Sequence, residues 1–365
     1  MTQPIKHVEG RSEVTPEFEI QYPEFGDVEK RLLNDFQHGF PLAPRPYAAI
    51  AQRLGVTEQE VLERLRALSR TGALSRIGAV VRPRALGAST LAAMGVPPVR
   101  LPEVAGLVNG YAEVNHNYER ENRLNLWFVA AAASEARLAA VLEEIERRSG
   151  IPVLSLPMLE DYHIDLGFDL CGGPSPPCRY TPRKGVTPVH GRTVPDENDR
   201  RLLAAIQHGL PLSSRPYAEA GAELGLGEAA VIERLQDLIA RGTIKRFGVV
   251  VRHHELGYTA NAMVVWDVAD EETAYAGGCL SRFDFVTLCY RRARRLPDWP
   301  YNLYCMIHGT SRDAVREKIA CLIDTCGLED LRHEVLFSRR RFKQRGPVYA
   351  GTEPERRPPF RPVEA

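Results

Sequence analysis

Two segments of the sequence combine side chains that bind carboxylates with side chains that transfer protons. The first, VNHNYERENRLNLWFV (114–129), contains His116 and Tyr118, and the second, VTLCYRRARRLPDWPYNLYCMIHG (286–309), contains Tyr290. Histidine, with an unperturbed pKa of about 6.5, is the best proton donor by type, and either tyrosine could donate a proton or a hydrogen bond. Arginine is a planar, permanently charged clamp for carboxylates. The arginines of the two segments are Arg120, Arg123, Arg291, Arg292, Arg294 and Arg295.

Neighbouring aromatic and amide side chains could complete a binding site, although plainer interpretations exist. Trp127, Trp299 and Tyr304 could line a flat ligand, but aromatic residues on strands more often belong to a core. Asn125 and Asn302 are further candidates for ligand binding. The plainer interpretation of the histidine is a hydrogen-bonded strand residue, and that of the arginine run is a solvated surface.

The two segments belong to two copies of one unit. RLLNDFQHGFPLAPRPYAAIAQRLG, which begins at Arg31, recurs as RLLAAIQHGLPLSSRPYAEAGAELG from Arg201, and 28 of the 57 positions in 31–87 are identical to those 170 residues later. Such self-similarity indicates a duplication. The match continues farther on once five extra residues are admitted in the second copy, but there His116 aligns with Leu288.

Hydrophobic spacing predicts three short helices and a strand at the start of each unit. In the first copy, residues 27–38 place apolar side chains on one helical face, a second helix opens at Pro46, and Thr57 with Glu60 forms a capping box before the third. Residues 73–81 are rich in β-branched and small apolar side chains and predict a wing strand. This pattern is typical of a winged helix-turn-helix.

The rest of each unit follows the order strand, helix, strand, strand, helix, strand, which predicts an α+β, ferredoxin-like (βαββαβ) domain. Its clearest helix, 134–150, has Ser134 as N-cap and Gly150 at its end. We expect the open face of such a sheet to be covered by the second copy. The predicted strands of the first copy are 91–96, 111–117, 123–131 and 153–159.

The predicted domains therefore repeat along the chain. They are an N-terminal extension (1–26), a first winged helix-turn-helix (27–82), a first ferredoxin-like domain (83–170), a Pro/Gly-rich linker (171–195), a second winged helix-turn-helix (196–252), a second ferredoxin-like domain (253–349) and a C-terminal tail (350–365).

Composition limits the class of protein and its compartment. Apolar residues make up 44% and charged residues 26% of the 365 residues, which excludes a disordered chain, a collagen and a membrane span. The polar N-terminus has no apolar core of a secretory signal, so we expect a cytoplasmic protein. Seven cysteines cannot pair completely, and we expect reduced thiols.

Charge argues against nucleic-acid binding, although the helix-turn-helix favours it. Lys plus Arg equals Asp plus Glu at 47 each, so the net charge is zero. The third helices are also poor partners for phosphates, because residues 57–70 have a net charge of zero and residues 227–240 of minus two. We expect these helices to serve as packing modules.

The motifs carry a family resemblance that spans 27–349. A winged helix-turn-helix followed by a ferredoxin-like domain resembles the Lrp/AsnC regulators. The 114–129 segment resembles the histidine-containing signature of one siroheme decarboxylase subunit, and 286–309 resembles that of its partner. RIGAVVRPRALG (76–87) and RFGVVVRHHELG (246–257) match the junction that both subunits share. The chain thus looks like a natural fusion of the two subunits, as in heme d1 biosynthesis.

The resemblance implies a carboxy-lyase that converts siroheme to 12,18-didecarboxysiroheme by removing two acetate carboxyl groups as carbon dioxide. It implies no cofactor beyond the iron of the substrate, and His163 could ligate that iron, whereas the second copy has Lys343 there. Because Leu288 replaces His116, either one pocket is catalytic or the two use different acids. The alternatives are a transcription regulator that senses a small ligand or tetrapyrrole, and a noncatalytic carrier. We expect no nucleic-acid or membrane partner, and an intramolecular pseudo-dimer that could associate further.

Overall fold

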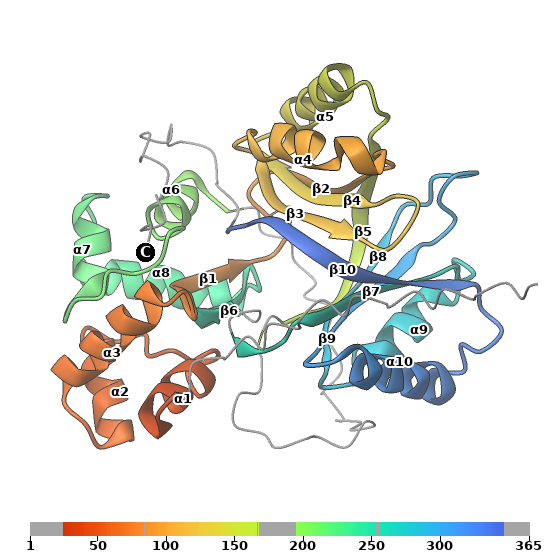
Figure 1. Cartoon of the computed structure of the whole chain (residues 1–365). Helices are drawn as coiled ribbons and strands as arrows, with labels where there is room; N and C mark the ends of the chain where they lie inside the picture. Colours follow the sequence, from red (N-terminus) through yellow and green to blue (C-terminus); the bar gives the residue numbers. More distant parts are fainter. Residues whose placement is uncertain (1–24, 84, 166, 168–194, 253–255, 347–365) are drawn as a thin grey trace, which may run out of the picture.

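The two copies fold alike in the computed structural model, which describes residues 25–83, 85–165, 167, 195–252 and 256–346. Figure 1 shows the helix-turn-helix elements of both copies gathered on one side and the strands of both copies gathered in a barrel on the other. The predicted extension, linker and tail lie almost entirely outside the described residues. The domain boundaries stay predictions.

The helical module contains three helices and one strand from each copy. As expected, Pro46 lies in the first turn of the second helix, and the Thr57–Glu60 capping box is formed. No helix among the described residues is long and apolar enough to cross a membrane. The elements are α1 (Asp27–Asn34), α2 (Pro46–Leu54), α3 (Glu58–Arg70) and β1 (Leu74–Val81), followed in the second copy by α6 (Glu197–Ala205), α7 (Pro216–Ala222), α8 (Glu228–Ala240) and β6 (Ile244–Val251).

The wing strands have a partner that the sequence did not predict. Strand β1 pairs antiparallel with β6, its own counterpart, with Gly78 opposite Gly248. The two copies also share one core, because Phe36 and Tyr47 of the first are buried in the same cluster as Tyr217 of the second. The pairing of the wing strands and the shared core therefore join the two helix-turn-helix units into one module.

Each copy then contributes a βαββαβ unit, in the predicted order. The first copy contains β2 (Ala88–Met94), α4 (Leu101–Asn109), β3 (Val114–Arg120), β4 (Leu126–Ala132), α5 (Glu135–Ser149) and β5 (Leu154–Ile164), with a short 3₁₀ turn at Pro98–Arg100. The second contains β7 (Ala260–Trp266), α9 (Thr273–Leu280), β8 (Val286–Arg292), β9 (Leu303–Gly309), α10 (Arg312–Cys326) and β10 (His333–Gln344). Ser134 caps α5 and Gly150 ends it in the left-handed conformation, as expected.

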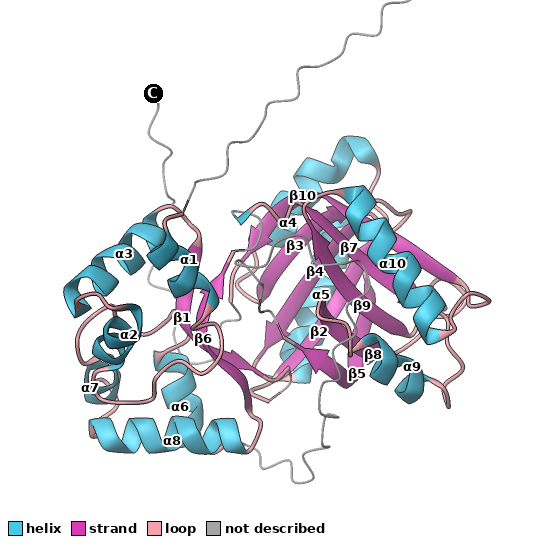
Figure 2. Cartoon of the chain, turned by 90° about the horizontal axis from the view of Figure 1, so that it is seen from below, coloured by secondary structure: helices cyan, strands magenta, loops and turns pink. Residues whose placement is uncertain are grey.

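The two sheets close into one barrel because their last strands are long enough to pair twice. Strand β5 pairs with β2 through residues 154–157 and with β8 through residues 158–164. Strand β10 pairs likewise with β7 and β3. The resulting order is β10-β3-β4-β2-β5-β8-β9-β7, and helices α4, α5, α9 and α10 lie on the outside of the barrel (Figure 2). The open faces of the two sheets thus cover each other, as expected, and their edges are joined as well.

The expectation that all cysteines are reduced thiols is wrong for Cys279, Cys321 and Cys326, which are disulfide-bonded. Cys279 of α9 and Cys326 of α10 form a disulfide, with their Cα atoms 5.9 Å apart. The two helices pack side by side against the second sheet, which brings together cysteines that are 47 residues apart in sequence. Cys289 and Cys305 are free and buried.

Reciprocal tyrosine hydrogen bonds hold the two helix-turn-helix units together and give a stability test. Tyr217 donates its hydroxyl to the Pro41 carbonyl at 2.8 Å, and Tyr47 donates to Pro211 at 3.0 Å. Because Tyr217→Phe leaves the Pro41 carbonyl without this donor, we expect the free energy of unfolding to fall by about 1–2 kcal/mol. Urea titration measures this free energy of unfolding. The matched variant Tyr275→Phe, at a side chain that is 77% exposed, should leave it unchanged; equal effects would contradict the assignment.

Candidate functional site

Alternate residues of β3 and β8 point into the barrel and bring the predicted site residues together. On β3 these are His116, Tyr118 and Arg120, while Val114 and Asn117 contact α4 and the outer core. On β8 the equivalent positions are Leu288, Tyr290 and Arg292, which contact the residues that fill the barrel. The strand period of two therefore separates the arginines of each segment into an inner and an outer group.

The two inner arginines bind backbone of the opposite copy. Arg120 donates to the Leu336 carbonyl of β10 at 3.0 Å, and Arg292 donates to the Leu156 carbonyl of β5 at 2.7 Å. Each guanidinium also lies over a tyrosine: the Arg292 carbon Cζ is 4.4 Å from the Tyr290 ring centroid, and the Arg120 Cζ is 5.7 Å from that of Tyr118. Burial lowers the pKa of Arg120 and raises that of Tyr118.

The barrel is closed at the end away from the helical module. The five extra residues of the second copy lie in the β8–β9 loop at that end (Figure 1), and their Trp299 donates a hydrogen bond to the Tyr304 hydroxyl at 2.7 Å. Its ring centroid is 5.2 Å from that of Trp127 and 4.9 Å from that of Tyr301. These aromatic residues are buried. They form the core of the barrel and seal it.

The end that faces the helical module brings cations to His116. Burial, and then the positive charge of Arg76 on β1, lower the pKa of His116 to about 4. Arg76 donates to the Ala79 carbonyl at 3.0 Å, and its counterpart Arg246 on β6 donates to Gln37 at 2.9 Å and to Val249 at 3.0 Å. Burial lowers the pKa of Arg246 to about 10. His116 is therefore uncharged at neutral pH and experiences the positive charge of Arg76.

A second histidine joins the helical module to the barrel. His38 lies 2.9 Å from Asp165, which follows β5. Although burial alone would raise it, the pKa of Asp165 is lowered by the hydrogen bonds from His38 and from the Gly167 N–H, and by the charge of Arg246. This contact therefore links the helical module to the residue that follows β5.

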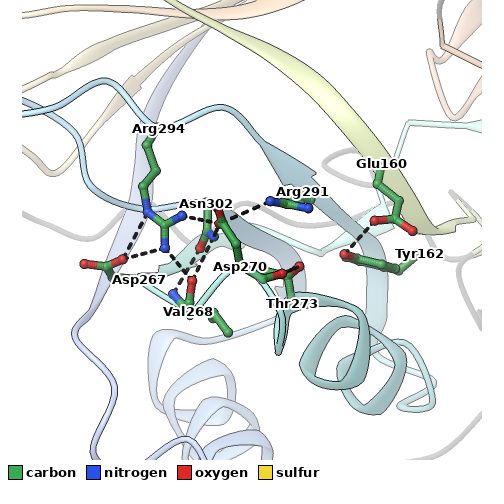
Figure 3. Close-up of polar contacts among 9 residues, drawn as sticks. All are labelled: Glu160, Tyr162, Asp267, Val268, Asp270, Thr273, Arg291, Arg294 and Asn302. Carbon is green, nitrogen blue, oxygen red and sulfur yellow. Dashed lines mark hydrogen bonds and ion pairs between the residues drawn. The ribbon is translucent and has the colours of Figure 1, made fainter.

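The outer arginines are held by carboxylates of their own copy. Arg294 binds Asp267 at 2.9 Å and also contacts Asp270 and the Val268 carbonyl, while Arg291 binds Asp270 at 3.1 Å (Figure 3). Asn302 donates to the same carboxylate at 2.9 Å. The sequence-based prediction that Arg291 and Arg294 bind substrate is untested, and such binding would require a substrate carboxylate to displace these partners.

The remaining candidates make backbone contacts. Asn125 binds both the N–H and the carbonyl of Val96, and Asn302 does the same to Val268. Arg295 donates to the Ser155 carbonyl at 2.8 Å, and Arg123 to that of Asp298. These contacts position loops, and a role of the four side chains in ligand binding stays a prediction.

His163 and Lys343 lie near the ends of the equivalent strands β5 and β10, and ligation of the substrate iron by His163 stays a prediction. His163 pairs with Cys289 in the β5–β8 register. Lys343 donates to the Asn109 and Tyr111 carbonyls at 2.7 and 2.9 Å, at the end of α4, and burial lowers its pKa to about 8. Within the described ranges, no group of three or more histidine, cysteine, aspartate or glutamate side chains could hold a metal ion.

Sequence reasoning did not select Arg76, Arg246 and Asp165 for the site. The signal was partly available, because both arginines are identical in the two copies and lie within the shared junction motif. Their place in the site depends on the pairing of β1 with β6, which positions the junction motif over the end of the barrel.

Comparisons with known proteins agree with this architecture. The sequence profile of the AsnC-like ligand binding domain matches residues 85–163 and 255–343, and that of the siroheme decarboxylase NirDL-like HTH domain matches residues 29–74 and 199–244. The siroheme decarboxylase NirDL subunit of Paracoccus denitrificans is 43% identical over 329 residues, which cover 89% of this chain and 98% of that protein.

Two solved structures share the fold. The crystal structure of the siroheme decarboxylase NirDL matches with a TM-score of 0.64 and 27% identity, covering 89% of this chain and 95% of that one. The structure of NirDL in complex with an iron-uroporphyrin III analogue matches with a TM-score of 0.62 and 28% identity, covering 88% and 93%.

The low pKa of His116 predicts a pH dependence of stability. Between the folded value of about 4 and the unfolded value of about 6.5, the unfolded chain binds more protons, so stability is lost as the pH falls through this window. His116→Leu, which copies Leu288, should lose less stability over the same window. Urea titrations between about pH 7 and pH 4.5 measure the difference. His208→Leu, at an exposed histidine, is the control; an unchanged pH dependence in His116→Leu would refute the assignment.

Proposed function

The chain belongs to the siroheme decarboxylase family and carries out that family's reaction, and we propose that the reaction takes place at the end of the barrel that faces the helical module. The observation that carries this location is the interaction of the buried His116 with the positive charge of Arg76, while the opposite end is filled by aromatic side chains. The family to which the chain belongs is that of the fused NirDL subunits, which matches the duplication in its sequence.

The chemistry needs an anchor, a dry site and a proton. In each decarboxylation the bond between the acetate methylene and the carboxyl carbon breaks, carbon dioxide leaves, and the electron pair remains on the methylene carbon, where the tetrapyrrole ring delocalises it. A proton added to that carbon gives the methyl group. The protein's part is to hold the other carboxylates, exclude water around the reacting one and deliver the proton.

His116 is the proposed proton donor, and substrate binding would charge it. In the free protein, burial and Arg76 keep it neutral at pH 7. A substrate with several carboxylates would neutralise the nearby arginines and place negative charge beside the imidazole, which raises its pKa. The histidine would therefore take up a proton as the substrate binds and release it to the methylene carbon.

The inner tyrosines and arginines would position the substrate from within the barrel. Tyr118 stacks beside His116 with ring centroids 6.3 Å apart, and Tyr290 occupies the matching place beside Leu288. Arg120 and Arg292 lie over these rings and add positive charge at a place from which bulk water is excluded. Either tyrosine hydroxyl could donate a hydrogen bond to a carboxylate of the substrate.

The cofactor requirement, the compartment and the oligomeric state of the protein remain proposals. We propose that the chain needs no cofactor beyond the substrate iron, that it works in the cytoplasm, and that one chain supplies both halves of the site, with or without a second copy. The product would serve heme d1 or an alternative route to heme. Nucleic-acid binding is not proposed, because Arg66 of α3 donates to the Leu212 carbonyl and Arg234 of α8 binds Asp199, which leaves few free cations on either helix.

The asymmetry between His116 and Leu288 gives a test by product analysis. His116→Gln should slow decarboxylation about 100-fold or more, the usual effect of removing a general acid, while siroheme still binds. Anaerobic incubation followed by mass spectrometry counts the carbon dioxide molecules lost. Loss of one carbon dioxide would mean that the two pockets use different acids, and loss of none that His116 serves both. Full retention of both decarboxylations would remove His116 from the mechanism.

Arg76 of β1 and the outer arginine Arg294 give a matched pair for a binding test. We expect Arg76→Gln, at the proposed site, to weaken siroheme binding about tenfold, because a carboxylate loses a charged partner. Arg294→Gln, whose guanidinium is held by Asp267, should leave the dissociation constant within about twofold and lower stability instead. Absorbance titration with siroheme measures binding. The reverse order of effects would move the site to the outer arginines.

A further inference from the structure

A surface cavity of about 430 Å³ lies on the outer face of the first sheet, between α5 and strands β2 and β5. It is separate from the proposed active site, because His116 points to the other face of this sheet. Its lining combines an apolar floor with carboxylates at its edge, chiefly Leu138, Leu142, Pro157, Glu135, Glu143 and Glu146. The carboxylates do not suit a polycarboxylate such as siroheme.

The strand registers identify the position in the second copy that is equivalent to this cavity. Pro157 pairs with Thr90 of β2 in the first copy, and Phe337 pairs with Ala262 of β7 in the second. The flanking helices α5 and α10 have the same length, and both begin after an N-cap serine. Position by position, Glu135 therefore corresponds to Arg312 and Ala139 to Arg316.

In the second copy this place is filled by the chain itself. The Phe337 ring lies beneath two guanidinium groups of α10, with the Arg312 Cζ 4.9 Å and the Arg316 Cζ 5.6 Å from its centroid. Arg312 is held in turn by Glu121 at 2.6 Å. An aromatic ring covered by arginine is a stable arrangement, since the cation is attracted to the face of the ring.

The first copy lacks the aromatic ring and both arginines that fill this position in the second copy, and it carries a negatively charged side chain there instead. Proline replaces the phenylalanine, alanine replaces Arg316, and Glu135 stands where the second copy has Arg312. Leu159, which follows on β5 and is 50% exposed, stands where the second copy has Arg339. An apolar floor edged by carboxylates, one of which stands in place of an arginine, matches a ligand that brings both the ring and the cation.

We propose that this cavity binds a segment of a partner protein that presents an arginine next to an aromatic side chain. The aromatic ring would occupy the space equivalent to the one that Phe337 fills in the second copy, and the guanidinium would bind the Glu143 carboxylate at the edge. Arginine and aromatic residues are also the side chains that most often dominate the binding energy of protein interfaces. The complementary charges favour this ligand over an acidic or purely apolar one.

The test measures binding of a fluorescent peptide, acetyl-Arg-Phe-Arg-amide, to the full chain by anisotropy, with acetyl-Glu-Phe-Glu-amide as the matched control. The plugged variant, Glu135→Arg with Ala139→Arg and Pro157→Phe, copies the second copy into the first. We expect saturable binding of the basic peptide alone, and at least a tenfold loss of affinity in the plugged variant. Glu143→Gln should weaken binding about threefold, more at low salt.

Three controls fix the interpretation. All variants should retain siroheme decarboxylation, because the cavity residues do not face the barrel interior; loss of activity would overturn the separation of the two sites. If the triple variant does not fold, Ala139→Arg alone fills part of the cavity and should still weaken binding. A chain that lacks residues 347–365 removes Arg356, Phe360 and Arg361. If only this shortened chain binds the peptide, the ligand is the chain's own C-terminus and a partner is excluded.

The proposal fails if the basic peptide shows no saturable binding to any form of the protein. It also fails if the plugged and unsubstituted proteins bind the peptide equally, since binding would then lie elsewhere. Equal affinity of the full-length and shortened chains, together with loss in the plugged variant, supports a partner protein.

Discussion

The pairing of each copy's last strand with the other copy is the constraint on which the rest of the structure depends. The first half of strand β5, like that of β10, pairs with a strand of its own copy, and the second half pairs with a strand of the other copy. Neither sheet is left with a free edge, which an isolated open sheet would present to solvent. The inner arginines follow from this exchange, because Arg120 and Arg292 donate to carbonyl groups of the strand that arrives from the other copy.

Closure of the barrel also decides where charge is placed. Two guanidinium groups inside it are acceptable because each has a carbonyl acceptor and a tyrosine ring, which offset part of the cost of removing a cation from water. The aromatic loop of the second copy seals one end. The junctions to the helical module bring Arg76 and Arg246 to the other end. The neutral chain thus concentrates positive charge at one internal place without an overall basic character.

The two copies share one scaffold because of the duplication, and their side chains differ at positions where the packing accepts more than one residue type. His116 and Leu288 occupy one equivalent position, and either fits against the barrel core. Phe337 and Pro157 occupy another, where the second copy has a ring covered by arginine and the first copy has a cavity. Positions that join the copies changed less: Tyr47 and Tyr217 keep reciprocal hydrogen bonds, because loss of either would leave a carbonyl in the shared core without a donor.

The sequence by itself determined the duplication, the order of helices and strands, the helix caps and the residues of both chemical signatures, because these depend on local periodicity and on short motifs. The alternation along β3 and β8 could even have separated Arg292 from Arg291. Only the tertiary structure decided that the wing strands pair with each other, that Asp267 and Asp270 hold the outer arginines, that Cys279 meets Cys326, and that Arg76 approaches His116. Each of these contacts joins residues from different elements, and local spacing does not specify such partners, because they meet only when the helices and strands have packed together.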